Sequence, residues 1–503
     1  MLKSKRGNKM SNTKNQAMAK DTIIYMIAKI IEGIVGVLTI SAMSYIYVPE
    51  QTGRYSTINI AITTVAMVLI QWLVQSVLRY INKYELDNKQ DEFFSTVFFS
   101  WFKVNILVFL ISSFVILIFS LGFFKSITSI YPISLIIVSI VMFFTYNTSQ
   151  LVIGMLAGFR KSKINLVLSV INVVGKLLGI IILNKLFITK IEWIFISYII
   201  FDFITALIGF IKLDIKKHIK KECFNKEILN VLKMYGMPLM GNMIATSVLN
   251  KSDIYVIQYF LGEDKVGIYQ TNYSIIASAF TLLAAGAMRG SYPTIIRTWS
   301  EGDTELTKIL ISNAIRTYLL ISLPAVVGVF CISDFVAKVL FEAKYFEGHS
   351  IMGFVALGMM FLGLTEYAIK PWELNARTKE IFKRSMISGI LNIILNIVFI
   401  KIFGYKFAGI STFLAFFIYF LLAKSGTKEY MPFNINKPSL YRILLSIFIM
   451  GASILLLKSF LPINIITLCI LVFVGMLVYT LSLYFTGEAK NEINIIVNKL
   501  KMK

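Results

Sequence analysis

Long apolar runs recur along the whole chain, and they constrain the fold more than any other feature of the sequence. A hydrocarbon core about 30 Å thick requires about 20 apolar residues per helix, and fourteen runs of that order occur. Their approximate bounds are 22–48, 56–78, 93–122, 132–158, 164–184, 192–211, 230–260, 266–293, 309–333, 351–369, 385–402, 407–423, 443–461 and 463–486. The sequence therefore predicts an all-α polytopic membrane protein with about fourteen transmembrane helices and no extramembrane domain.

The composition excludes the main soluble classes. Hydrophobic residues make up 57% of the 503 residues and charged residues 15%, where soluble domains have about 45–50% and about 25%. A soluble enzyme, a nucleic-acid-binding domain and a disordered scaffold each need more polar surface than this. The net charge of +23 is typical of membrane proteins with positively charged cytoplasmic loops, so we expect membrane lipid and no nucleic acid as a partner.

Charge and small motifs limit topology and chemistry further. Lys and Arg concentrate in the tails and the even-numbered connections, which predicts that both termini are cytoplasmic. The basic tail 1–21 has no apolar core, so the first span is expected to direct insertion. Cys223, Cys331 and Cys469 are too far apart for a metal motif. We expect no metal, no cofactor and no catalytic residues.

Two sequence echoes indicate an internal repeat. Residues 49–57 (PEQTGRYST) superpose on residues 263–271 (EDKVGIYQT) at an offset of 214, which aligns Gly53 with Gly267. A second echo, at an offset of 220, aligns Asn172 with Asn392. A repeat of six spans gives two bundles of the same orientation, related by a pseudo-twofold axis along the membrane normal.

This repeat divides the chain into six parts. We expect a cytoplasmic tail (1–21), an N-terminal six-helix bundle (22–211), a cytoplasmic linker (212–229), a C-terminal six-helix bundle (230–428), two additional transmembrane helices (429–486) and a cytoplasmic tail (487–503). Transporters of this plan hold their substrate near the midplane between the halves and expose it alternately by rocking.

Ionisable residues inside spans are functional candidates, because they are costly in lipid. Four cations are predicted to form a basic cavity for an anionic headgroup: Lys29, Arg79, Lys176 and Arg289. Four carboxylates are candidates for ion coupling or charge pairing: Glu32, Asp202, Asp253 and Glu366. The alternative for Lys29 with Glu32, and for Lys176 with Asp202, is that they are structural ion pairs.

Polar stripes at helical spacing accompany these charges. Span five aligns Asn165, Ser169, Asn172 and Lys176, and span seven aligns Asn242, Thr246, Asn250 and Asp253. Span eleven aligns Ser385, Ser388, Asn392 and Asn396. Such stripes are predicted to face a cavity or a neighbouring helix.

The motif residues resemble those of a known family. The segment 235–238 (YGMP), the segment 252–255 (SDIY), Gly262 and the segment 266–269 (VGIY) resemble the second-half motif of the polysaccharide-biosynthesis flippases. These belong to the multidrug/oligosaccharidyl-lipid/polysaccharide exporter superfamily. The resemblance extends over residues 22–486 in span count and order.

The resemblance implies a function and a partner. It implies translocation of an undecaprenyl-pyrophosphate-linked oligosaccharide across a bacterial plasma membrane, for capsule, exopolysaccharide or O-antigen assembly. Lys29 and Arg289 have positions suited to binding the pyrophosphate. A polysaccharide polymerase is a candidate partner protein. A cation-coupled drug exporter or a peptidoglycan-precursor flippase of the same superfamily is the alternative. The lysine at position 29 and the absence of arginine in span one make lipid II the weaker cargo. A membrane enzyme would need a larger catalytic loop than any here.

Overall fold

The computed structural model describes residues 24, 26–121, 129–432 and 436–490, and within these ranges the chain forms helices and no strand. The first helix is Met26–Ile46. It is followed by α2 (Pro49–Leu69), α3 (Gln71–Leu86), α4 (Gln90–Ser120), α6 (Ile133–Gly158), α7 (Ser162–Leu186), α8 (Glu192–Lys212), α9 (Ile215–His218), η1 (Lys221–Cys223), α10 (Lys226–Leu261), α11 (Glu263–Ser300), α12 (Thr304–Leu340), η2 (Ala343–Gly348), α13 (His349–Ala368), α14 (Lys370–Leu374), α15 (Thr378–Phe403), η3 (Tyr405–Phe407), α16 (Ala408–Thr427), α17 (Lys437–Lys458) and α18 (Ile465–Phe485).

The described helices confirm the all-α, polytopic prediction. Twelve are long and apolar enough to cross a membrane, and a thirteenth span is the pair α2 and α3, bent by 51°. The remaining predicted span, 230–260, lies on α10, which is helical but is not among the helices that pass this test, since Asn242, Asn250, Lys251 and Asp253 reduce its hydropathy. The tail 1–21 and most of the tail 487–503 lie outside the described residues.

Local signals in the sequence explain several helix ends. The side chains of Asp303, Asn436 and Asn464 accept hydrogen bonds from backbone N–H groups in the first turns of α12, α17 and α18. Such caps satisfy donors that the helix itself leaves free. Pro49 opens α2, where its missing N–H is not needed. Gly262 separates α10 from α11 with a φ of +83°, a conformation that favours glycine.

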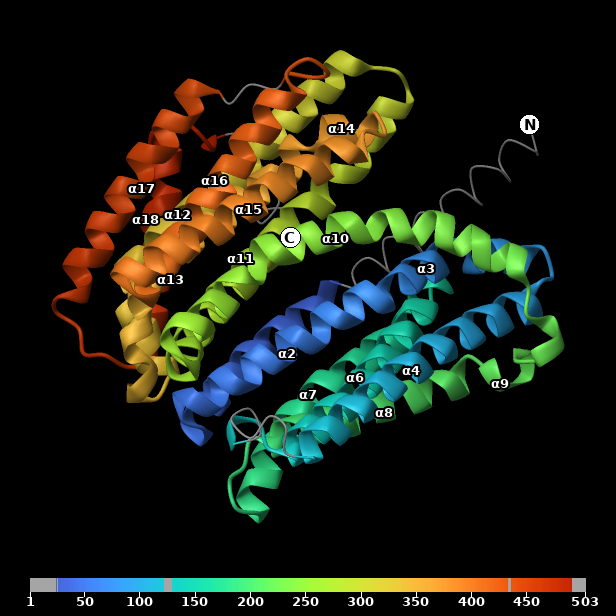
Figure 1. Ribbon diagram of the computed structural model, residues 1–503. Helices are drawn as coiled ribbons and strands as arrows, with labels where there is room; N and C mark the ends of the chain where they lie inside the picture. The colour runs from blue at the N-terminus through green and yellow to red at the C-terminus, as the bar shows by residue number, and fades with distance from the viewer. Residues whose placement is uncertain (1–23, 25, 122–128, 433–435, 491–503) are drawn as a thin grey trace. The chain divides into compact units, whose positions relative to one another are not determined.

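The chain divides into two compact units. Unit 1 comprises residues 1–47 and 54–247, and unit 2 comprises residues 48–53 and 248–503. In unit 1, α8 packs against α6 and α7, and α3 packs against α6 (Figure 1). Two hydrophobic clusters support this packing, one around Val77, Val97 and Val152 and one around Ile180 and Phe195.

Unit 2 is organised around α13. This helix packs against α11, α12 and α16, while α17 and α18 pack against each other and against α12. A cluster around Phe335, Met450 and Leu471 joins α17 and α18 to α12. The division between the units falls within α10 and not in the predicted linker 212–229, which contains α9, η1 and the start of α10. A division into compact units does not define the ends of six-helix bundles, so the predicted bundle boundaries stay a prediction.

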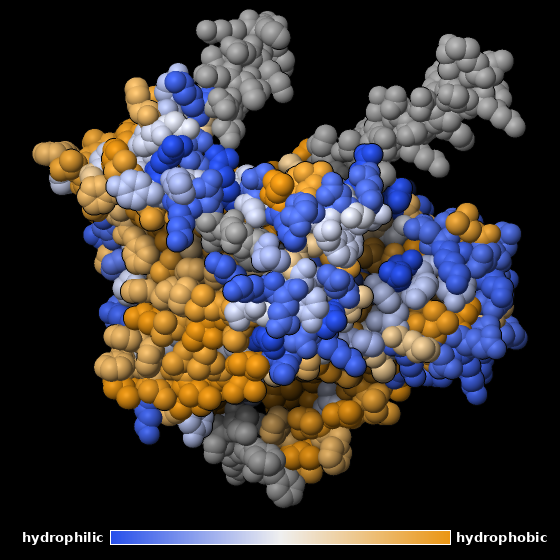
Figure 2. All heavy atoms as spheres, turned by 90° about the horizontal axis from the view of Figure 1, so that it is seen from above, coloured by the Kyte–Doolittle hydropathy of each residue, from blue (hydrophilic) through white to orange (hydrophobic). Residues whose placement is uncertain are grey.

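Apolar side chains cover much of the surface. On α4, Phe109, Leu110 and Phe114 are exposed, as are Phe448 on α17 and Phe473 on α18. Figure 2 shows broad apolar areas on the visible face, with hydrophilic residues gathered in separate areas. Large exposed apolar surfaces are expected for helices that contact lipid, so the protein is a multi-pass membrane protein.

Candidate functional site

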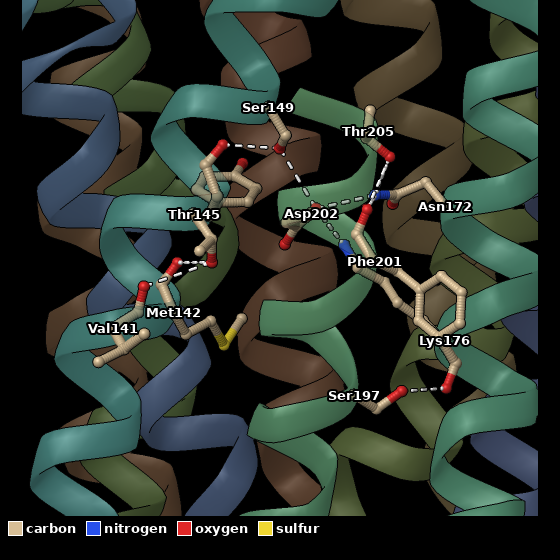
Figure 3. A network of polar contacts seen from close by, with 11 residues as sticks. Val141, Met142, Thr145, Ser149, Asn172, Lys176, Ser197, Phe201, Asp202 and Thr205 are labelled. Carbon is tan, nitrogen blue, oxygen red and sulfur yellow. Dashed lines mark hydrogen bonds and ion pairs between the residues drawn. The ribbon is translucent and has the colours of Figure 1, made fainter. Parts of the chain in front are cut away.

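A buried ion pair joins α7 and α8 in unit 1. The ammonium Nζ of Lys176 lies 2.7 Å from Oδ1 of Asp202 (Figure 3). The Asp202 side chain is 1% exposed and that of Lys176 is 16% exposed. Asn172 on α7 and Ser149 on α6 donate to the same carboxylate oxygen at 2.9 and 3.2 Å. Three donors from two helices therefore converge on one oxygen of α8.

The second carboxylate oxygen of Asp202 differs from the first in its hydrogen bonding. Oδ2 is buried and has no hydrogen-bond partner within the part of the chain that the structure describes. Buried polar atoms are almost always paired, so each exception calls for an explanation. The amide nitrogen of Asn172 has more acceptors than its two N–H groups can serve, because the Phe201 carbonyl at 3.2 Å and the Thr205 hydroxyl at 3.0 Å also lie within hydrogen-bond distance.

The second expected ion pair is also present, and it is more exposed. Nζ of Lys29 lies 2.6 Å from Oε2 of Glu32, one turn further along the helix Met26–Ile46. The exposed fractions are 57% for the Lys29 side chain and 25% for the Glu32 side chain. Exposed pairs of this kind stabilise a helix only slightly, so most of the Lys29 charge stays accessible to a ligand or to solvent.

Arg79 lies against aromatic rings at the α3–α10 contact of unit 1. Its guanidinium carbon is 4.7 Å from the centre of the Tyr235 ring and 5.8 Å from that of the Tyr80 ring. The side chain is exposed. Arginine over tyrosine is a favourable cation–π arrangement. Beside it, the Ser76 hydroxyl donates to the Leu232 carbonyl at 2.7 Å, which fixes α3 against α10.

Asp253 and the preceding Ser252 each make polar contacts that join α10 to another helix of unit 2. The Asp253 side chain is 3% exposed and accepts a hydrogen bond from the hydroxyl of Tyr269 on α11. Oδ1 of the neighbouring Asn392 accepts from Ser252 at 2.8 Å and from Asn396 at 2.5 Å. The motif residues Ser252, Asp253 and Tyr269 therefore hold α10 to α11 and α15.

The polar stripes have different surroundings. Asn165, Ser169 and Asn172 on α7 are buried, and so are all four stripe residues of α15. On α10, Asp253 is buried but Asn242 and Thr246 are exposed. The buried residues of α7 and α15 therefore face neighbouring helices, as predicted. An exposed residue can also line an open cavity, so the surroundings of the stripe on α10 stay a prediction.

Glu366 and Arg289 belong to unit 2. Glu366 is exposed on α13 and lines a cavity of about 270 Å³ between α11 and α13, together with Thr281, Ala285 and Met359. The backbone of Arg289 continues α11, but its side chain lies outside what the structure describes. Lys29, Arg79 and Lys176 belong to unit 1, so each unit carries part of the predicted cation set.

The repeat motif has a role that the sequence did not reveal. Gly53 and Gly267 lie at a reciprocal contact within unit 2. A Cβ atom on Gly53 would be 1.8 Å from the Glu263 carbonyl oxygen, and one on Gly267 would be 1.9 Å from the Pro49 carbonyl oxygen. Each glycine thus meets the carbonyl four residues before the other glycine. A twofold-related contact has this reciprocity, and the aligned glycines at an offset of 214 were its signal.

Solved structures with the same fold are membrane transporters. The lipid II flippase MurJ in an inward closed conformation superposes with a TM-score of 0.72 and 17% identity, covering 94% of this chain and all of that chain. An inward-facing multidrug resistance MATE family transporter of the MOP superfamily gives a TM-score of 0.59 and 14% identity, covering 80% of this chain and 95% of that chain. At these identities the likeness concerns the fold alone.

Two curated proteins are similar in sequence. A probable low-salt glycan biosynthesis flippase, Agl15 of Haloferax volcanii, is 26% identical over 239 residues, which is 45% of this chain. The chain spans about half of that relative's length, namely 48%. An uncharacterised membrane protein of Methanocaldococcus jannaschii is 22% identical over 361 residues, covering 69% of this chain and 71% of the relative.

The family is established by a match that covers more than half of the sequence. The model of the family described as polysaccharide biosynthesis protein matches residues 18–299. This range includes all of unit 1 described by the structure, the Gly53–Gly267 contact and the hydrogen bond from Tyr269 to Asp253. The chain is therefore a member of the polysaccharide biosynthesis protein family.

Proposed function

We propose that this protein is a flippase that translocates undecaprenyl-pyrophosphate-linked oligosaccharide repeat units across a bacterial plasma membrane. It acts by alternating access, for capsule, exopolysaccharide or O-antigen synthesis, and it is not an enzyme. Both termini are cytoplasmic, and a polysaccharide polymerase acts on the delivered units. The proposal is supported by the family match over residues 18–299 and by the name of the Haloferax relative, a glycan biosynthesis flippase.

One structural observation carries the substrate assignment. Lys176 keeps its ammonium group inside a membrane-spanning helix pair, with a side chain only 16% exposed. A cation inside a membrane-spanning segment is costly, and such residues are functional candidates by default. A pyrophosphate that enters a low-dielectric space needs several cations to compensate for its lost hydration. Lys29 and Arg79, both exposed in the same unit, and Arg289 on α11 are proposed to complete the site.

Each of the four carboxylates is proposed either to bind a coupling ion or to form an ion pair with a cationic side chain. Glu32 and Asp202 pair with Lys29 and Lys176. Asp253 is buried and Glu366 lines the cavity between α11 and α13, so these two are the candidates for binding a coupling ion in unit 2.

The test is transport by protein with single cations removed. Inverted vesicles that contain the protein and a pyrophosphate-linked oligosaccharide are assayed for exposure of the glycan in the opposite leaflet. We expect Lys29→Ala and Arg289→Ala to abolish transport while insertion is unchanged. Lys379→Ala removes an exposed lysine at the start of α15 and is the matched control, for which we expect normal transport. Normal transport by both Ala variants would exclude the proposed basic site.

A cation-coupled drug exporter or a peptidoglycan-precursor flippase is the second candidate, favoured by the MurJ and MATE folds. An exporter should confer drug resistance when it is overproduced, whereas loss of the proposed flippase should leave lipid-linked glycan in the inner leaflet. Drug resistance is measured in an overproducing strain and the leaflet position of the lipid-linked glycan in a deletion strain, and the two results together separate a drug exporter from a glycan flippase.

A further inference from the structure

The ion pair of Lys176 and Asp202 has an asymmetry that the substrate assignment does not explain. Ser149, Asn172 and Lys176, the described residues that donate to this carboxylate, all bind the same oxygen, Oδ1. Oδ2 is buried without a partner among the described residues. The two oxygens of a protonated carboxyl group also differ in this way, because one carries the proton and the other remains a hydrogen-bond acceptor. A proton on Oδ2 would therefore leave the hydrogen bonds to Oδ1 in place.

We propose that Lys176 exchanges between Asp202 and the phosphate group of the substrate, and that Asp202 takes up one proton when Lys176 leaves. This rests on the proposed function, since it assumes an anionic lipid pyrophosphate. Before binding, the ammonium of Lys176 neutralises the Asp202 carboxylate. After binding, the ammonium neutralises a phosphate oxygen, and a proton from the aqueous phase resides on Oδ2 of Asp202. Charge and protons balance, because one proton enters for each substrate bound.

Burial makes this exchange obligatory. An ionised carboxylate that is 1% exposed is strongly destabilised once the ammonium group that it pairs with in the described part of the chain leaves. The amide of Asn172 and the hydroxyl of Ser149 stay on Oδ1 in either state, so the protonated group keeps its hydrogen bonds. Lys176 is more exposed than Asp202, which makes the lysine the mobile partner.

Among the residues that the structure describes, Lys176 is the one cation paired with Asp202. The other titratable side chains that the described residues place within electrostatic reach of Asp202 include Tyr146 on α6, Tyr198 on α8 and Tyr55 on α2. The Lys176 ammonium also lies 4.7 Å from the centre of the Tyr198 ring, which provides a second weak contact as the lysine moves. Tyrosines are neutral at physiological pH, so the proton is the remaining compensating charge.

The first experiment needs no substrate. Infrared spectroscopy of the purified full-length protein at pH 7 detects the carbonyl band of a protonated carboxyl group. We expect Lys176→Gln to gain one such band relative to wild type, and Lys176→Gln combined with Asp202→Asn to lose it. Thermal melting and size-exclusion chromatography check that each variant is folded. A folded Lys176→Gln protein without the additional band would overturn the inference, whatever the substrate is.

The second experiment measures binding of farnesyl pyrophosphate between pH 5.5 and 8.5. Asp202→Asn cannot take up the proton, so it records the ligand's own titration. As the pH rises, the affinity of wild type relative to that of Asp202→Asn should fall by about tenfold per pH unit. This slope applies where Asp202 is ionised in the unliganded protein and protonated in the complex, because binding then takes up one proton. Asp334→Asn, which removes the carboxylate paired with Lys458 at 2.6 Å in unit 2, should behave like wild type.

The outcomes separate this inference from the proposed function. Binding with the same pH dependence in wild type and Asp202→Asn would overturn the exchange and leave the pyrophosphate assignment standing. If wild type does not bind farnesyl pyrophosphate although Lys176→Gln shows the additional carboxyl band, both the phosphate as exchange partner and the proposed substrate class would be overturned.

Discussion

The reciprocal contact of Gly53 and Gly267 can be tested by addition of a single methyl group. In Gly53→Ala the new Cβ would lie 1.8 Å from the Glu263 carbonyl oxygen, and Cβ atoms essentially never approach other atoms within 3.0 Å. The backbones of α2 and α11 must therefore separate by about 1.2 Å, with about 1.1 Å for Gly267→Ala. The obstructing atoms are backbone carbonyls, which cannot rotate away as a flexible side chain can.

The expected cost follows from this separation. Overpacking a close contact costs about 1–3 kcal/mol, and a rigid backbone places both variants near the upper end. The gain in helix propensity on replacing glycine by alanine offsets at most about 1 kcal/mol. We therefore expect each variant to lose roughly 2 kcal/mol of stability, which lowers the Tm by several degrees. The assay is thermal unfolding of the purified protein in detergent.

The double variant tests the reciprocity itself. Once one methyl group has separated the two helices, the second methyl group has less left to displace. Gly53→Ala with Gly267→Ala should therefore cost less than the sum of the single variants, with a coupling of about 0.5–3 kcal/mol. Gly286→Ala is the control in α11, since a Cβ there meets nothing within 4 Å. Single variants as stable as Gly286→Ala, or a strictly additive double variant, would refute the contact.

Two further variants test helix packing in each unit. In unit 1, Gly236→Ala should destabilise the α3–α10 contact by about 1–3 kcal/mol, because its Cβ would lie 2.3 Å from the Trp72 carbonyl oxygen; a Tm equal to wild type would contradict this. In unit 2, Glu488→Ala should cost about 3–5 kcal/mol, because it leaves Arg316 without the carboxylate that it binds at 2.7 Å. Arg316→Ala should then add little in the double variant, and independent effects of the two changes would argue against the pair.

Much of the fold was predictable from the sequence because lipid imposes a simple rule. A run of about 20 apolar residues must form a helix whose backbone groups are all satisfied internally. Apart from a few residues at the ends, the described residues of each predicted span are helical, with the span 56–78 divided between α2 and α3. The α2–α3 bend at Ile70 was not predictable, because it falls inside one apolar run without proline or glycine. The span 230–260 was predicted as an apolar run, but α10 carries enough polar residues that it is not among the described helices apolar enough to cross a membrane.

The site residues were predictable only one helix at a time. The pair of Lys29 and Glu32 follows from a spacing of three residues on one helix. The contact of Arg79 with Tyr235 depends on the packing of α3 against α10. The rotation of each helix and the angle at which two helices cross cannot be deduced from a single sequence. The same limit explains why Asp202 could be proposed as a partner of Lys176 while its unpaired Oδ2 could not be foreseen.

The repeat adds an argument about where coupling resides. The offset of 220 places Asn172 and Lys176 of α7 on Asn392 and Asn396 of α15. In unit 1 the lysine binds a buried carboxylate at 2.7 Å, whereas in unit 2 the two asparagines bind each other at 2.5 Å. Asn396 is neutral and cannot neutralise a phosphate or release a carboxylate. Equivalent positions therefore carry different chemistry, and the proposed proton-linked exchange belongs to the N-terminal copy alone.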